Sequence, residues 1–201
     1  MRHGSRRHFA RTSPAHVTLR LMPDVPSLRL LPITREIERT FARGCDRPGF
    51  RLVHYSLQGN HAHLIVEAQD RDALGRGMMA IGARLARAVN RIANRKGRVV
   101  ADRYHHRPLS TPKEVRNALR YVLLNARRHG TTARNALGRV VGIDTASSGR
   151  WFDGWKRQRP VTGNERDSGP SDLRPVARAR TWLLAVGWRR HGLLDPADVP
   201  G

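Results

Sequence analysis

Cysteine and long apolar runs are scarce in this chain. Cys45 is the only cysteine, which excludes an intramolecular disulfide and a zinc site built from thiolates. No run of apolar residues approaches the roughly 18 that a membrane span requires. The basic N-terminus, Met1 to Arg11, is not followed by an apolar segment, so it does not resemble a secretory signal. We therefore expect a cytoplasmic protein with no membrane partner.

Acidic residues are also few. The 201 residues include 16 acidic and 38 basic side chains, for a formal net charge of +22. Lysine occurs only at Lys96, Lys113 and Lys156, so the charge comes mainly from arginine, whose planar guanidinium matches phosphate oxygens. An arginine-rich host proteome would explain the preference for arginine over lysine, but not the excess of basic residues. The charge therefore favours a polyanionic partner, and nucleic acid in particular.

The length suits one domain with a substantial core and a tail. We expect a basic arm over residues 1–14, a folded domain over 15–131 and a C-terminal extension over 132–201. Within the extension, residues 156–175 are rich in Pro, Gly, Ser, Asp and Arg and resemble a linker. Thr181–Arg190 contains two tryptophans and is expected either to form a short amphipathic helix on the core or to bind a partner.

Apolar periodicity predicts an α+β domain. Alternation predicts strands over residues 17–21, 50–58, 61–67 and 99–104, and spacings of three and four predict helices over 33–41, 74–92 and 112–129. Thr111, Pro112 and Glu114 form a capping box with proline at the first helical position, and Gly130 can end that helix. The order strand, helix, strand, strand, helix, strand, helix is typical of a ferredoxin-like sandwich with a central antiparallel sheet.

The stretch Asn60–His63 contains the first candidate site. Residues two apart on a strand point to the same face of a sheet, so His61 and His63 present two imidazoles side by side, an arrangement suited to one metal ion. The alternative is that both are ordinary polar residues on the open face of an antiparallel sheet.

Tyr121 and Asn125 lie one turn apart on the last predicted helix and therefore share a face. A tyrosine hydroxyl can attack a phosphate that a divalent cation polarises, and the asparagine carbonyl oxygen can complete the shell of a hard ion. The alternatives are that Tyr121 is a core residue with its hydroxyl at the rim and that Asn125 is an ordinary surface residue.

Together these motifs resemble the HUH superfamily of single-tyrosine nucleases, especially its insertion-sequence transposases and REP-associated tyrosine transposases. The family motif Asn-His-x-His is matched by Asn60–His63, and the nucleophile helix Tyr-Ile-x-x-Asn-Pro is matched by Tyr121–Ala126. The resemblance covers roughly residues 14–131. Gly59 and Ala126 stand where the family pattern often has proline, which alters the backbone but removes no chemical group.

The resemblance implies a metal-dependent transposase that cleaves and joins single-stranded DNA. His61, His63 and Asn125 would hold Mg²⁺ or Mn²⁺, and Tyr121 would attack the scissile phosphate to give a 5′-phosphotyrosine and a free 3′-hydroxyl. The substrate would be single-stranded DNA with a nearby hairpin, cut in the course of DNA transposition. Such proteins include both monomers and dimers, so a homodimer stays open.

Arginines on two predicted helices are candidate nucleic-acid contacts. Arg84, Arg87, Arg91 and Arg95 recur along one face of the helix that includes Leu74. Arg128 shares the face of Tyr121 on the last helix. Charged residues on a helix are commonly no more than solvated surface, and the sequence does not decide between these interpretations.

Two other functions are compatible with the sequence. A non-catalytic ferredoxin-like module could bind DNA or RNA, but it would need neither the His pair nor Tyr121. A relaxase or replication initiator of the same superfamily would usually be a larger protein. Tyr104, beside His105 and His106, is a second candidate nucleophile, but adjacent histidines point to opposite faces of a strand and make a poor two-ligand site. We expect Tyr104 and His106 to be structural or to contact DNA.

Overall fold

A computed structural model of the protein describes residues 12–128, 143–156 and 174–198. Its centre is a five-stranded antiparallel sheet in the order β2-β3-β4-β1-β5. The strands are β1 (Ser13–Arg20), β2 (Asp46–Arg47), β3 (Phe50–Leu57), β4 (His61–Ala68) and β5 (His105–Pro108). The helices are α1 (Leu31–Ala42), α2 (Arg71–Ile92), α3 (Pro112–Arg128), η1 (Ser148–Trp151), α4 (Trp182–Ala185) and η3 (Gly187–His191). The α+β sandwich predicted from the sequence is confirmed.

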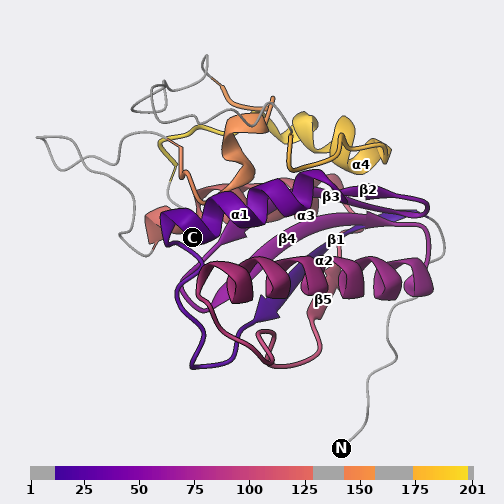
Figure 1. Ribbon diagram of the computed structural model, residues 1–201. Helices are drawn as coiled ribbons and strands as arrows, with labels where there is room; N and C mark the ends of the chain where they lie inside the picture. Colours follow the sequence, from indigo (N-terminus) through magenta and orange to yellow (C-terminus); the bar gives the residue numbers. More distant parts are fainter. Residues whose placement is uncertain (1–11, 129–142, 157–173, 199–201) are drawn as a thin grey trace, which may run out of the picture.

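Both faces of the sheet are covered. Helices α1 and α2 lie in front of the sheet and α3 lies behind it in Figure 1. Strand β4 contributes side chains to the cores on both faces of the sheet. Ala62, Leu64 and Val66 pack in the α1–α2 core, and Ile65 packs in the α3 core. The alternation of this strand therefore places His61 and His63 on the α3 face.

The start of α3 follows the capping signal in the sequence. The Thr111 hydroxyl oxygen accepts a hydrogen bond from the Glu114 amide at 3.2 Å, and the Glu114 carboxylate accepts from the amides of Ser110 and Thr111. The predicted core residues of this helix, Val115, Ala118, Leu119 and Val122, are all buried. The capping box thus fixes which face of α3 meets the sheet.

Several predicted boundaries were wrong. The strand expected over residues 99–104 is absent, and β5 begins only at His105. Val99 is an apolar residue, which made residues 99–104 look like a strand, and it is only 1% exposed. In the structure, these residues form only a single β-bridge, between Val100 and Leu21. Strand β1 begins at Ser13, inside the range expected for the basic arm, and residues 1–11 lie outside the described residues. Ile92, expected in the core stripe of α2, is 41% exposed at the last position of the helix.

The C-terminal extension packs on α3. Leu184 and Trp188 of α4 and η3 are buried in the same apolar cluster as Val122. The buried Glu67 carboxylate, on β4, accepts hydrogen bonds from the amides of Arg180 and Thr181 and from the Thr181 hydroxyl. Thr181–Arg190 therefore packs on the core through Leu184 and Trp188, while Trp182 and Val186 are exposed. The expected linker lies almost wholly outside the described residues, as does Gly130.

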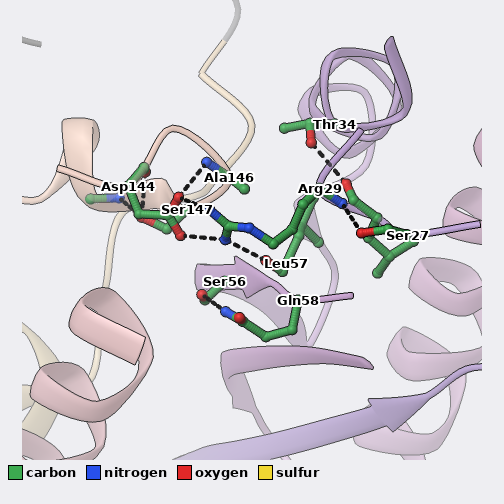
Figure 2. A network of polar contacts seen from close by, with 11 residues as sticks. Ser27, Arg29, Thr34, Ser56, Leu57, Gln58, Asp144, Ala146 and Ser147 are labelled. Carbon is green, nitrogen blue, oxygen red and sulfur yellow. Dashed lines mark hydrogen bonds and ion pairs between the residues drawn. The ribbon is translucent and has the colours of Figure 1, made fainter. Parts of the chain in front are cut away.

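A second contact fixes the extension beside the Gly59-Asn60 turn. The Arg29 guanidinium donates to both carboxylate oxygens of Asp144, at 2.9 and 2.8 Å, and to the carbonyl oxygen of Leu57 (Figure 2). The Leu57 amide in turn donates to the carbonyl of Ala146 at 2.8 Å. These bonds hold the end of β3, and with it the turn that leads into the two histidines.

No helix among the described residues is long and apolar enough to span a membrane.

The buried His54 makes the fold sensitive to acid. Burial, with a smaller contribution from Arg174, lowers the pKa of His54 to about 3. The unfolded chain therefore binds a proton below about pH 6.5 that the folded chain does not, and the free energy of unfolding falls by up to about 1.4 kcal/mol per pH unit toward pH 3. His54→Gln retains a polar partner for Ser148 but does not titrate. Urea denaturation between about pH 7 and pH 4 is expected to show a shallower loss of stability in this variant. Equal slopes in the two proteins would contradict this role.

Candidate functional site

The rings of His61 and His63 meet on the α3 face of the sheet. Their Nε2 atoms are 3.1 Å apart, and the ring planes are nearly perpendicular. His63 is 5% exposed, whereas His61 lies partly open at the start of β4. Two ring nitrogens at this distance must share a proton or a cation, because two lone pairs would otherwise face each other.

Neighbouring groups orient each ring from its other side. Asn60 Oδ1 can only accept, so it takes the hydrogen bond of His61 Nδ1 at 2.9 Å and leaves His61 Nε2 as the lone pair. His63 Nδ1 lies 3.2 Å from both the Thr18 hydroxyl and His16 Nε2. Such outer contacts set the tautomer of metal-binding histidines. Thr18 can donate or accept, so it accommodates either tautomer of His63.

His16 supports this arrangement as a neutral ring. Burial, followed by the charge of Arg107, lowers the pKa of His16 to about 4. The ring is therefore uncharged near neutral pH, and its Nε2 can accept a hydrogen bond from His63 Nδ1. Strand pairing explains its place: Thr18 is directly opposite His63, and His16 is two residues further along the same face of β1.

The separation of the two Nε2 atoms fits one metal ion. Two ligands at right angles on an ion with bonds of about 2.1 Å are about 3.0 Å apart, close to the 3.1 Å observed. Within the described part of the chain, no group of three or more His, Cys, Asp and Glu side chains is arranged to hold a metal. A further ligand for this pair from the described residues would therefore be of another type.

Tyr121, on α3, approaches the Nε2 atom of His63. Its hydroxyl lies 3.4 Å from His63 Nε2, and its ring meets those of His63 and His16 edge-on. The side chain is partly exposed and lines two adjoining cavities. The Tyr121 hydroxyl therefore contacts the His pair, and a substrate can reach the side chain through the cavities.

Asn125 is fully buried, so the surface alternative for it was wrong. Neither its side-chain oxygen nor its nitrogen has a hydrogen-bond partner among the described residues. A buried amide without partners costs free energy. A cation bound by the carbonyl oxygen would compensate part of that cost, so the donor chemistry of Asn125 fits a hard metal ion.

Two arginines that the sequence did not indicate line cavities together with Tyr121. Arg20 lies opposite His61 across β1 and β4 and lines a cavity of about 670 Å³ with the His pair and Tyr121. Arg107, from β5, lines a second cavity of about 430 Å³ with His16, Arg120 and Tyr121. The polar positions of β1 (His16, Thr18 and Arg20) alternate with Val17 and Leu19, which was a signal that this strand presents a polar face.

Of the predicted arginine stripe, Arg84, Arg87 and Arg91 lie on α2, across the sheet from Tyr121, whereas Arg95 follows the end of that helix at Ile92. Arg91 forms an ion pair with Glu36 at 2.8 Å and Arg95 with Asp24 at 2.6 Å. Arg84 packs over Gly44 and donates to the carbonyl of Thr40. These three side chains connect α2 to α1 and to neighbouring loops. Arg87 is exposed, and the side chain of Arg128 lies outside the described residues.

The other tyrosines lie apart from the His pair. Tyr104 packs against the α1–α2 core and contacts the ring of His106. Tyr55 is fully buried and donates its hydroxyl proton to Glu38 at 2.8 Å. Among the three tyrosines, Tyr121 alone contacts the His61–His63 pair in the described structure.

The unpartnered amide of Asn125 generates a stability prediction. Asn125→Leu keeps a similar volume and removes two buried polar groups, so in the presence of EDTA it is expected to raise the free energy of unfolding by about 1–3 kcal/mol. Urea denaturation measures the change, with Asn117→Leu, an exposed position on the same helix, as the control. A less stable Asn125→Leu variant would show that the amide has partners in the folded protein.

Comparison with solved structures identifies a similar fold. A REP-associated tyrosine transposase, solved in complex with a REP hairpin, superposes with a TM-score of 0.56 at 15% identity, covering 90% of this chain and all of that one. A candidate transposase from Deinococcus radiodurans gives a TM-score of 0.42 at 14% identity, over 55% of this chain and 87% of that one, too weak a likeness to support an argument. No protein-family model and no curated protein matches the sequence. Over most of its length, the chain has the fold of the REP-associated tyrosine transposase.

Proposed function

We propose that the protein is a metal-dependent single-stranded DNA endonuclease and strand transferase that acts in DNA transposition. The observation that carries this proposal is the position of the Tyr121 hydroxyl, 3.4 Å from the His63 nitrogen that faces His61. The fold shared with a transposase that binds a REP hairpin supports single-stranded or hairpin DNA as the substrate. The net charge of +22 suits the same partner.

His61, His63 and Asn125 are the residues that would hold Mg²⁺ or Mn²⁺. When bound, the ion would polarise the scissile phosphate and neutralise the charge that develops on it. The protein orients the two rings through Asn60 and Thr18. Arg20, at the mouth of the same cavity, would bind a phosphate oxygen through its guanidinium.

Tyr121 would act as the nucleophile. Its hydroxyl loses a proton to water in the open cavity, and its oxygen forms a bond to phosphorus as the bond from phosphorus to O3′ breaks. The departing O3′ takes up a proton, leaving a 3′-hydroxyl and a 5′-phosphotyrosine. Because the new ester conserves the phosphodiester, attack by another 3′-hydroxyl rejoins a strand without ATP.

A non-catalytic DNA- or RNA-binding module is the alternative. Such a module would use the same basic surface, but it has no need of a tyrosine hydroxyl beside paired histidines. A relaxase or replication initiator would use the same chemistry in a different process. Covalent attachment of the protein to DNA distinguishes the proposed nuclease from the non-catalytic module, which would form no such adduct.

Tyr121→Phe is expected to abolish the covalent adduct. The substitution removes only the hydroxyl oxygen, which contributes about 1 kcal/mol or less to stability, so folding and DNA binding should persist. Denaturing gels of protein incubated with Mn²⁺ and labelled single-stranded DNA from the flanks of its own gene measure the adduct. Tyr104→Phe is the matched control and should form it normally. An adduct that persists in Tyr121→Phe would place the nucleophile elsewhere, and none in the unaltered protein despite tight binding would favour the non-catalytic module.

The metal can be tested without DNA. At about one hundred times its Kd, Mn²⁺ is expected to stabilise the folded protein by about 2.7 kcal/mol. His61→Ala should lose this stabilisation, because one of the two facing nitrogens is gone. His105→Ala, an exposed histidine of β5, should keep it. Thermal unfolding with and without Mn²⁺ provides the measurement, and an equal shift in His61→Ala would rule out the His pair as the metal site.

A further inference from the structure

A long groove lies on the opposite side of the sheet from Tyr121. It measures about 1270 Å³, between α2 and the segment 97–108. This volume exceeds the roughly 300–1,000 Å³ of a site for one small molecule. An extended occupant therefore suits it better than a compact one.

The middle of α2, from Gly75 to Ala86, contributes only small and apolar side chains to this groove. Gly75 and Gly82 lie two turns apart on the helix, and a Cβ added at either would meet nothing within 4 Å. Met79, between them, is 75% exposed. Tyr104 and His106 form part of the opposite wall and supply aromatic rings on which bases can stack.

The charged residues of the groove are mainly cations. Arg71, Arg98 and Arg103 line it, and all three are exposed, with Asp102 as the one carboxylate among the lining residues. No ion pair joins any of these arginines to a carboxylate in the described residues, in contrast to Arg91 and Arg95 of the predicted stripe. Stacking surfaces edged by arginines are the composition of a single-strand binding site.

Strand β5 separates this groove from the Tyr121 cavity. Alternation along β5 directs Arg107, which pairs with His16, toward the Tyr121 cavity, while His106, which pairs with Val17, lines the α2 groove. β5 is an edge strand of the sheet. A strand of nucleic acid can therefore pass over this edge from one cavity to the other without crossing the core.

We propose that the groove between α2 and residues 97–108 binds single-stranded DNA, as a second segment of the strand whose phosphate lies at Tyr121. This inference rests on the proposed function only in taking DNA as the occupant. A second copy of the chain, docked through the glycine face of α2 or the β5 edge, is the competing occupant. The exposed arginines disfavour it, since two such grooves would repel each other.

Binding is best measured in a Tyr121→Phe background, which separates it from cleavage. The probe is a fluorescein-labelled single-stranded DNA of about twenty nucleotides. Combined Arg71→Gln and Arg103→Gln substitutions should weaken binding roughly tenfold at low salt and make the slope of log K against log salt shallower by about 1.4, the value for two single-strand phosphate contacts. Arg76→Gln, an exposed arginine of α2 outside the groove, should leave both quantities unchanged.

A steric variant tests the same groove without altering charge. Gly82→Leu places a side chain in open space and improves helix propensity, so stability should not fall, but affinity for the probe should drop roughly tenfold. Ala80→Leu, on the same helix outside the groove, is the control. Wild-type affinity in both groove variants would overturn the inference, as would a dimer that Gly82→Leu converts to a monomer without changing DNA binding. Loss of affinity in the groove variants, together with no adduct in protein that retains Tyr121, would sustain the groove and refute the nuclease.

Discussion

The alternation of β4 is the constraint on which the rest of the structure depends. This strand lies between β3 and β1 and has a covered face on each side, with Leu64 in one core and Ile65 in the other. A slip of one residue would bury the histidines in the α1–α2 core and move the apolar side chains of that core to the α3 face. Contacts at both ends oppose such a slip: the Arg29–Asp144 pair beside the turn and the Glu67 carboxylate at the far end.

The alternation of β4 also brings the polar groups of the site together around His63. His63 is nearly buried, yet each of its nitrogens meets a polar group: Nδ1 meets Thr18 and His16, and Nε2 meets His61 and Tyr121. A buried imidazole surrounded in this way is held in one orientation before any substrate arrives. The C-terminal extension contributes indirectly, because it covers the back of α3 and so keeps Tyr121 against the sheet.

The sequence predicted the local parts of this arrangement better than the assembled ones. The capping box at Thr111 and the His61–His63 repeat depend on spacings of two to four residues, and both are in place. The burial of Asn125 was missed because it results from tertiary packing, which local sequence patterns do not predict. The role of β1 was missed since the sequence shows its polar face but not that it pairs with β4. The ion pairs of Arg91 and Arg95 could not be predicted, because their partners, Glu36 and Asp24, are distant in sequence.

The central claim is that the His pair and Tyr121 act together on one phosphate. Anomalous diffraction from crystals of the Tyr121→Phe protein with Mn²⁺ and single-stranded DNA tests it most directly. We expect one manganese peak about 2.1–2.2 Å from the Nε2 atoms of both His61 and His63. We also expect a DNA phosphate between that ion and the edge of the phenyl ring introduced by the substitution. Manganese bound elsewhere, or a phosphate remote from the substituted ring, would contradict the account.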